Sequence, residues 1–336
     1  MKKLLALILS LSLLALTGCA PVTVVVGNCT CPGSNCPTDG GNNTPAEGEL
    51  NTGYALVATA SEKDGKLSYD VTLVGVLVDA NGVIADCVID SLPASITVDA
   101  TGKITGDLSA ALVTKNELGD NYMMQSGSWK KQAGALAAYA KGKTVAQLKN
   151  GAIDETGKAP AGSDLASSAS IYLGGYVSAI EKAASQAAAL GAKAGDTLKM
   201  AVTGKLTGAD FGEKNGNVQL ELDFAVVTMS GDVITSCVID SLQAKVEFDG
   251  TGKIVTDLSK AFATKNDLGD NYMMQSGSWK KQAGALAAYA TGKTVAELKN
   301  GAIDETGKAP AGSDLASSAS IYLGGYVSVI EKACKG

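Results

Sequence analysis

The segment Asp86-Cys87-Val88-Ile89-Asp90-Ser91-Leu92 recurs 150 residues later as Ser236-Cys237-Val238-Ile239-Asp240-Ser241-Leu242. The agreement then widens, because residues 114–183 return as residues 264–333 with four differences. Those differences are Glu117/Asp267, Lys141/Thr291, Gln147/Glu297 and Ala179/Val329. A period of this length exceeds the roughly 20–50 residues of solenoid repeats and matches the size of a whole domain. The chain therefore predicts two copies of one module.

Each copy begins with strand signals. Leu67–Val78 is rich in β-branched residues, and Asp79–Gly82 is a turn that ends in Asn-Gly. Val83–Asp90 then predicts the returning strand, and a short strand is expected at residues 95–98. The second copy repeats this pattern at residues 218–229, 233–240 and 245–248.

Helical signals follow the strands in each copy. Trp129–Ala140 is rich in alanine, with Ser128 as its expected N-cap and a glycine just past its end. Thr144 is expected to cap a short helix to Lys149. A last helix follows the serine-rich residues 167–170, and we expect it to continue through residues 187–190.

Strands first and helices afterwards indicate an α+β fold, not an alternating parallel one. We therefore expect two tandem repeated domains, each an antiparallel sheet packed with C-terminal helices. The predicted boundaries place the first domain at residues 51–190 and the second at residues 191–336.

The N-terminus has the pattern of a secretory signal. Lys2 and Lys3 precede an apolar run from Leu4 to Leu16, which is shorter than the about 20 residues that a membrane-spanning helix needs. The run ends in Leu16-Thr17-Gly18-Cys19, which resembles the lipobox of bacterial lipoproteins. An ordinary secretory signal with an incidental cysteine is the alternative interpretation.

The lipobox resemblance implies cleavage after residue 18 and a diacylglycerol thioether on Cys19, usually with an acylated amine. Two lipid chains hold a protein stably on a membrane. We therefore expect a mature protein that lies outside the cytoplasm, with the membrane as a partner through Cys19. Residues 19–50 are rich in Gly, Pro, Asn and Thr, which indicates a flexible tether.

Composition excludes several kinds of function. The chain has no histidine and no arginine, and its formal net charge is −6. Catalytic triads that use histidine, and histidine metal sites, are therefore excluded. Nucleic acid is not an expected partner either, because the chain is acidic and lacks arginine.

The cysteines do not indicate a particular function. Besides Cys19, the chain contains Cys29, Cys31, Cys36, Cys87, Cys237 and Cys334, whose pairing the sequence leaves open. Three nearby thiols fall short of the four ligands of a zinc site, so residues 29–36 suggest a tether with a local disulfide or free thiols. Cys87 and Cys237 occupy equivalent strand positions beside apolar residues and predict buried free thiols.

One short motif suggests a cofactor. Asp164-Leu165-Ala166-Ser167-Ser168-Ala169-Ser170 precedes the last helix, and residues 314–320 repeat it. After the hairpin strands and the tryptophan-bearing helix, this order resembles the FMN-binding domain family, whose motif is Asp-x-x-(Ser/Thr)-Gly-Ala-(Thr/Ser). That family includes lipid-anchored extracellular electron carriers.

The resemblance implies FMN held through a phosphoester on Ser170 and Ser320. The site residues that match the motif are Asp164, Ser167, Ser170, Asp314, Ser317 and Ser320. A hydroxyl at the start of the last helix would place a phosphate near free backbone N–H groups. Trp129 and Tyr122 are expected to offer a flat wall to the flavin ring, as are their copies Trp279 and Tyr272.

The motif departs from the family in one place, because Ser168 and Ser318 replace its glycine. Glycine there would allow a positive φ, which serine adopts only with strain. The alternative interpretation is a serine-rich helix cap without any cofactor.

Two functions follow from these alternatives. The preferred one is a surface lipoprotein that acts as a non-catalytic binding or scaffolding module on an FMN-binding-like fold. The alternative is an extracellular electron-transfer flavoprotein. No catalytic or metal-binding residue is assigned. Met123 and Met124 suggest core packing, with a soft ligand pair as the other possibility.

Overall fold

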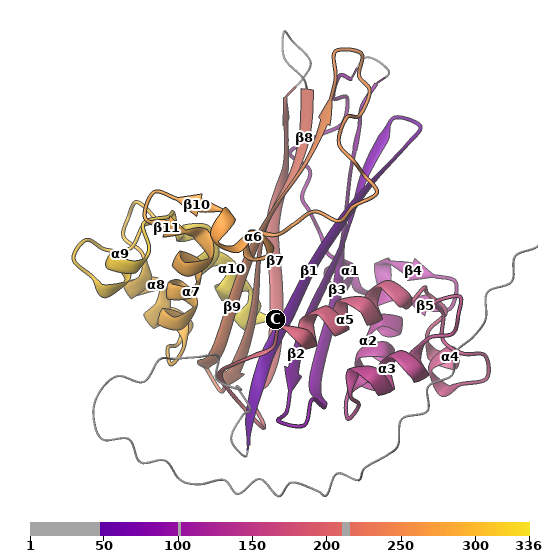
Figure 1. The fold of residues 1–336 in the computed structure, drawn as a ribbon, viewed down its shortest axis with the longest axis horizontal. Coiled ribbons are helices and arrows are strands. Elements are labelled where there is room, and N and C mark those ends of the chain that lie inside the picture. Colours follow the sequence, from indigo (N-terminus) through magenta and orange to yellow (C-terminus); the bar gives the residue numbers. More distant parts are fainter. Residues whose placement is uncertain (1–47, 100–101, 210–215) are drawn as a thin grey trace, which may run out of the picture. The chain divides into compact units, whose positions relative to one another are not determined.

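Two antiparallel sheets face each other at the centre of the fold (Figure 1). The computed structural model describes residues 48–99, 102–209 and 216–336, and all of them belong to one compact unit. The first sheet has the strand order β3-β2-β1-β6 and the second has the order β7-β8-β9. The strands are β1 (Glu49–Lys63), β2 (Lys66–Val78), β3 (Ile84–Thr97), β6 (Ala188–Lys193), β7 (Thr197–Ala209), β8 (Gly216–Ser230) and β9 (Val233–Phe248).

The burial of β2 explains its sequence pattern. From Lys66 to Leu73 buried and more exposed residues alternate, whereas Val74–Val78 is buried throughout. Leu73 and Leu77 face the core between the sheets, while Val74 and Val76 face the helices. One end of the sheets therefore has helices on its outer face, and the other end extends beyond them (Figure 1).

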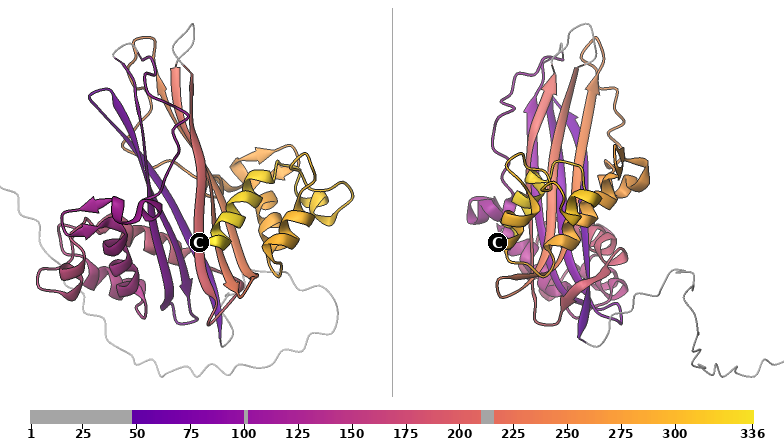
Figure 2. Two further views of the ribbon diagram at one scale, coloured as in Figure 1. Left: turned by 180° about the vertical axis from the view of Figure 1, so that it is seen from behind. Right: turned by 90° about the vertical axis from the view of Figure 1, so that its left-hand side faces the viewer.

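Each hairpin is followed by its own group of helices, which covers the outer face of the nearer sheet (Figure 2). The first group contains α1 (Lys115–Leu118), α2 (Trp129–Ala140), α3 (Val145–Ala152), α4 (Asp164–Ser168) and α5 (Gly174–Ser185). The second group contains α6 (Lys265–Leu268), α7 (Trp279–Ala290), α8 (Val295–Ala302), α9 (Asp314–Ser318) and α10 (Gly324–Lys335). Small hairpins join β4 (Met123–Met124) to β5 (Gly127–Ser128), and β10 (Met273–Met274) to β11 (Gly277–Ser278).

The segments between sheet and helices cross from one repeat to the other. Phe262, which follows β9, donates its backbone N–H to the carbonyl of Ala58 in β1 at 2.9 Å and packs near the ring of Tyr69. In the opposite direction, Ile104 lies against Gly208 of β7 so closely that a Cβ there would be 2.5 Å from its Cδ1. The central core therefore contains residues of both repeats.

Several local predictions are confirmed. The strand expected at Leu67–Val78 is β2, and the helix at Trp129–Ala140 is α2. Thr144 caps α3 through a reciprocal capping box with Gln147. Ser128 precedes α2 as expected, but its hydroxyl donates to Asp120 at 2.8 Å and makes no capping bond.

Other predictions need correction. The expected strands at 83–90 and 95–98 form one continuous strand, β3, which tolerates Pro93 because β3 is an edge strand. The helix expected through residues 187–190 is wrong, since Ala188–Lys193 is β6 and pairs with β1. Strands β1 and β7 were not predicted, and β1 begins within the expected tether.

The fold is mixed, with helices packed on antiparallel sheets, in agreement with the coarse prediction. The predicted domain boundary between residues 190 and 191 falls inside β6. The signal peptide of residues 1–18, Cys19, the thiols of Cys29, Cys31 and Cys36, and most of the tether lie outside the described residues.

Candidate functional site

The serine-rich motif forms a short helix of its own. Ser163 caps α4, which ends at Ser168, and the hydroxyl of Ser167 donates to the carbonyl of Asp164 at 2.6 Å. The final helix α5 begins only at Gly174. The expectation that Ser170 stands at the start of the final helix is therefore wrong, and the same holds for Ser320, because α10 begins at Gly324.

A glutamine that the sequence analysis missed holds the serine turn. The buried Oε1 of Gln132 accepts the backbone N–H of Ser170 at 2.7 Å, its hydroxyl at 3.1 Å and the N–H of Ile171 at 3.2 Å. Its Nε2 donates to the carbonyl of Gly127 in β5. Gln282 repeats the three accepted bonds with Ser320 and Ile321. The two turns thus have identical anchors, and Ser170 and Ser320 are exposed residues whose hydroxyls are bonded to these glutamines.

The replacement of the motif glycine causes no backbone strain. Ser168 and Ser318 are the last residues of α4 and α9. Among the described residues other than glycine, Asp64 alone has a positive φ. The prediction that serine is strained at this position is therefore wrong, because the local conformation is helical.

The aromatic wall expected for a flavin is not available. Trp129 is 1% exposed, and its Nε1 donates to the hydroxyl of Tyr176 at 3.1 Å. The ammonium of Lys115 lies 5.3 Å from the centre of the Trp129 ring and 5.2 Å from that of Tyr122. The second repeat has the same arrangement, since Trp279 is equally buried and its Nε1 donates to the hydroxyl of Tyr326. The residues present do not fit a flavin ring stacked on Trp129.

A polar cavity of about 390 Å³ occurs in the second repeat and is lined by Asp223, Lys265 and Tyr326. Burial raises the pKa of Asp223, lowers the pKa of Lys265 and raises the pKa of Tyr326 to about 12. The register of the sheets places Thr72 where the second repeat has Asp223. In the first repeat the carboxylate of Asp70 acts on Lys115 and Tyr176 instead, so the position of the acidic residue differs between the repeats.

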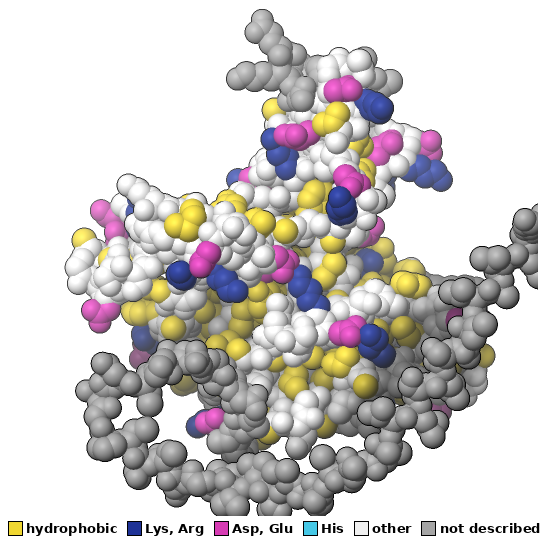
Figure 3. Space-filling model, in the orientation of Figure 1, with side chains coloured by type: hydrophobic (Ala, Val, Ile, Leu, Met, Phe, Trp, Pro, Cys, Tyr) yellow, Lys and Arg dark blue, Asp and Glu magenta, His cyan; other side chains and the backbone are white. Residues whose placement is uncertain are grey.

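A larger cleft of about 600 Å³ lies where the two repeats meet. One wall is the face of α7, a second is β9, and a third is formed by β6. Figure 3 shows hydrophobic side chains gathered on this face beside α7. The lining residues are Thr52, Tyr54, Gln186, Ala188, Ala189, Leu190, Cys237, Val238, Ile239, Asn266, Lys280, Gly284, Ala287, Ala288 and Thr291.

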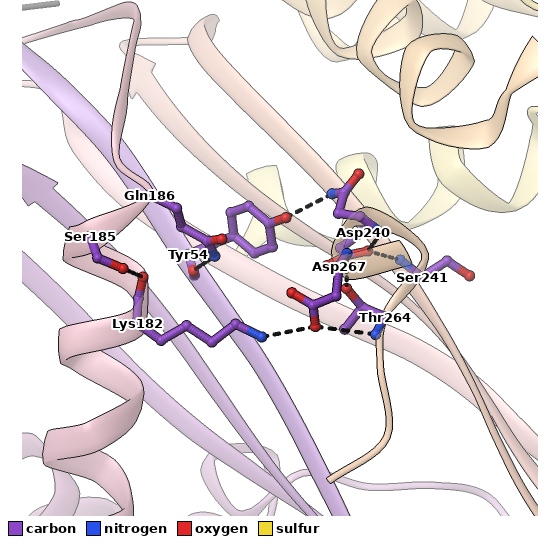
Figure 4. Close-up of polar contacts among 9 residues, drawn as sticks. Tyr54, Lys182, Ser185, Gln186, Asp240, Ser241, Thr264 and Asp267 are labelled. Atoms are coloured by element: carbon purple, nitrogen blue, oxygen red, sulfur yellow. Dashed lines mark hydrogen bonds and ion pairs between the residues drawn. The ribbon is translucent and has the colours of Figure 1, made fainter. Parts of the chain in front are cut away.

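Hydrogen bonds between the repeats fix one end of the cleft (Figure 4). The Nδ2 of Asn266 donates to the hydroxyl of Tyr54 at 2.7 Å. The carboxylate of Asp240 accepts the backbone N–H groups of Asn266 and Ser241. Burial raises the pKa of Asp240 to about 6, and burial followed by the nearby Asp240 raises the pKa of Tyr54. Tyr54 is therefore a neutral, positioned hydroxyl.

The described thiols are buried and unpaired, as predicted for Cys87 and Cys237. Cys334, whose pairing the sequence left open, is also a free buried thiol. Burial raises the pKa of Cys87 to about 12 and that of Cys334 to about 11. These thiols are consequently poor nucleophiles at neutral pH.

The prediction that Met123 and Met124 pack in the core is wrong. Met123 is 63% exposed and Met124 is 39% exposed, so core packing is wrong for both. They are neighbours on β4, which directs their side chains to opposite faces. Within residues 48–99, 102–209 and 216–336, no group of three or more Cys, Asp or Glu residues is placed to hold a metal ion. The same described part of the chain has no helix both long and apolar enough to cross a membrane.

Comparison with known proteins gives no relative. The chain matches no protein-family model, no curated protein and no solved structure. The resemblance to the FMN-binding domain family therefore rests on the short serine motif and the order of elements alone.

Proposed function

We propose that the chain is a lipid-anchored, non-catalytic binding module whose ligand occupies the cleft between the repeats. The observation that carries this proposal is the cleft of about 600 Å³ with walls from both repeats. Its size lies within the roughly 300–1,000 Å³ of small-molecule sites, and apolar walls with a few positioned polar groups are typical of them. In this proposal the repeats are two tandem α+β modules whose duplication creates the site.

The chemistry of the cleft favours binding over turnover. Tyr54 has a raised pKa and accepts a hydrogen bond from Asn266, and Lys280 is exposed. General acid–base catalysis requires groups that reach the substrate and whose pKa values lie near the working pH. Tyr54 is not such a group, because its raised pKa keeps the hydroxyl protonated at neutral pH.

Ligand-observed NMR with a panel of small apolar molecules tests the binding proposal. Gly284→Leu places a side chain in the cleft, and a Cβ at Gly284 meets no atom within 4 Å, so the helix accepts it. Gly134→Leu is the matched control at the same position of α2. We expect Gly284→Leu alone to lose binding; equal binding by both variants would contradict a ligand in this cleft.

The anchor and the location outside the cytoplasm are proposed from Leu16-Thr17-Gly18-Cys19. Metabolic labelling with a palmitate analogue in the native host should label the wild-type chain and leave Cys19→Ser unlabelled. Labelling of both would place the lipid elsewhere.

A flavin carrier is the second candidate, and it is favoured by the exposure of Ser170 and Ser320, the residues that would carry the phosphoester. The intact mass of the protein from its native host decides this question. One or two added FMN masses that disappear in Ser170→Ala/Ser320→Ala would establish the carrier. A mass explained by lipid alone would exclude it.

A further inference from the structure

We infer that the cleft between the repeats takes a single-chain amphipathic anion, with its apolar body between α7 and β6 and its carboxylate at Lys280. This inference rests on the proposed function and names the ligand class for the same site.

A single helical face supplies one wall. Lys280, Gly284, Ala287, Ala288 and Thr291 are spaced so that they fall on one side of α7. Because the middle of this face carries only hydrogen and methyl groups, the helix leaves a smooth, shallow apolar surface. The opposite wall consists of Ala188, Ala189 and Leu190, and Leu190 is 37% exposed. An unbranched chain fits between two such walls without displacing large side chains.

The residues that line the cleft include a positively charged side chain and no negatively charged one. Lys280 is the single charged residue among those that line it, and it stands in the first turn of α7, where the helix dipole also favours an anion. The nearest carboxylates at the polar end are already engaged, since Asp267 pairs with Lys182 at 2.9 Å and Asp240 accepts backbone N–H groups. Asp270, whose carboxylate is also within electrostatic range of Lys280, pairs with Lys281 at 3.4 Å. A carboxylate of the ligand would therefore meet the ammonium of Lys280.

The first repeat has the same helix but different residues beside it. Lys130, Gly134, Ala137 and Ala138 repeat the face on α2, but the next position of the stripe is Lys141, which pairs with Asp86 at 2.5 Å. The second repeat has Thr291 and Ser236 at these positions, and the backbone of Gly191 in β6 lies beside Thr291. In the second repeat two small hydroxyl residues therefore stand where β6 lies against β9, and no ion pair of the described residues interrupts the third wall of the cleft.

Isothermal titration of decanoate into the full chain carrying Cys19→Ser, which prevents lipidation, tests the inference. Decanol and decylammonium at the same concentration, below their micelle ranges, are the neutral and cationic probes. We expect decanoate to bind best, and Lys280→Gln to weaken it about two- to five-fold at low salt, with the difference shrinking in 1 M NaCl. Gly284→Leu should remove binding, while Lys130→Gln and Gly134→Leu should match the parent protein.

The outcomes separate the two proposals. If all three probes bind equally and Gly284→Leu removes all of them, the cleft binds ligands but the preference for an anion is overturned. If no probe binds and the NMR panel also finds no ligand, both proposals fail. If decanoate binds only after deletion of residues 20–47, or only when self-association of the chain is broken, another part of the protein occupies the cleft and the inference is overturned.

Discussion

The ammonium of Lys182 in α5 lies 2.9 Å from the carboxylate of Asp267 in α6, so the last helix of the first repeat is tied to the first helix of the second. The reciprocal pair also exists, because Lys332 in α10 lies 2.6 Å from Glu117 in α1. Contact of the same patch with its own copy is the arrangement of an isologous dimer. The two repeats therefore meet as such a dimer would, within one chain.

Removing both ion pairs should have a small, salt-dependent effect. All four side chains are about a third exposed, and exposed pairs contribute about 0–1 kcal/mol each. Glu117→Gln/Asp267→Asn leaves the lysines in place, because Lys332 also donates to the carbonyl of Val202 at 2.9 Å. This variant should lower the free energy of unfolding by at most about 2 kcal/mol in dilute salt. Urea denaturation in 20 mM and 1 M NaCl measures this, since the loss should shrink in high salt. A loss that is equally large in 1 M NaCl would mean that packing, not charge, is responsible.

Ser236→Asp should be far more harmful than the reverse change in the first repeat. Ser236 is fully buried between Thr52 and Thr228, whose hydroxyls lie 2.8 and 2.7 Å from its own. A carboxylate there would be buried without a cation, which costs about 3–5 kcal/mol. The control Asp86→Ser removes only a partly exposed ion pair and should cost less than about 1 kcal/mol. Urea denaturation of both variants checks the contrast, and similar midpoints would refute the view that β1 and β8 bury this position.

Asp240 should make the protein less stable as the pH rises. Burial raises its pKa to about 6 in the folded protein, above about 3.9 in the unfolded chain. The folded state therefore holds the proton more tightly, and the stabilisation present below pH 4 is lost as the pH passes 6. Between pH 4 and 7, Asp240→Asn should remove a decline of up to about 3 kcal/mol in the free energy of unfolding.

The measurement is urea denaturation of wild type and Asp240→Asn across that pH range. Asp90 is the equivalent carboxylate, and burial also raises its pKa, so Asp90→Asn should change the slope in the same direction. An identical pH dependence in wild type and Asp240→Asn would show that Asp240 does not titrate in this range.

Gln132→Ala should loosen the serine turn. The substitution removes the acceptor of three hydrogen bonds and leaves the buried N–H of Ile171 without its partner. An unsatisfied buried polar group costs about 1–3 kcal/mol, so stability should fall by that amount. Hydrogen exchange should rise at the amides of Ser170 and Ile171 and stay unchanged at Ser320. Gln282→Ala should raise exchange at Ser320 and leave it unchanged at Ser170. If the amide of Ser170 stays protected in Gln132→Ala, the turn does not depend on this glutamine.

Local signals allowed much of each repeat to be predicted. The β-branched run of Leu67–Val78, the alanine-rich Trp129–Ala140 and the capping Thr144 each act on residues within a few positions, so sequence alone identified β2, α2 and α3. Burial of side chains was less predictable. The same apolar character is compatible with the buried Trp129 and the exposed Met123, because burial depends on which element covers a residue.

The sequence by itself established that one segment occurs twice, and it predicted strands before helices in each copy. Its composition also excludes histidine and arginine chemistry. Only the tertiary structure decided that the repeats share a core, that residues 188–193 form a strand, and that a cleft opens on one side of the pair. The physical reason is distance along the chain. Thr52 meets Ser236 and Tyr54 meets Asn266 across about two hundred residues, and no local propensity encodes such contacts.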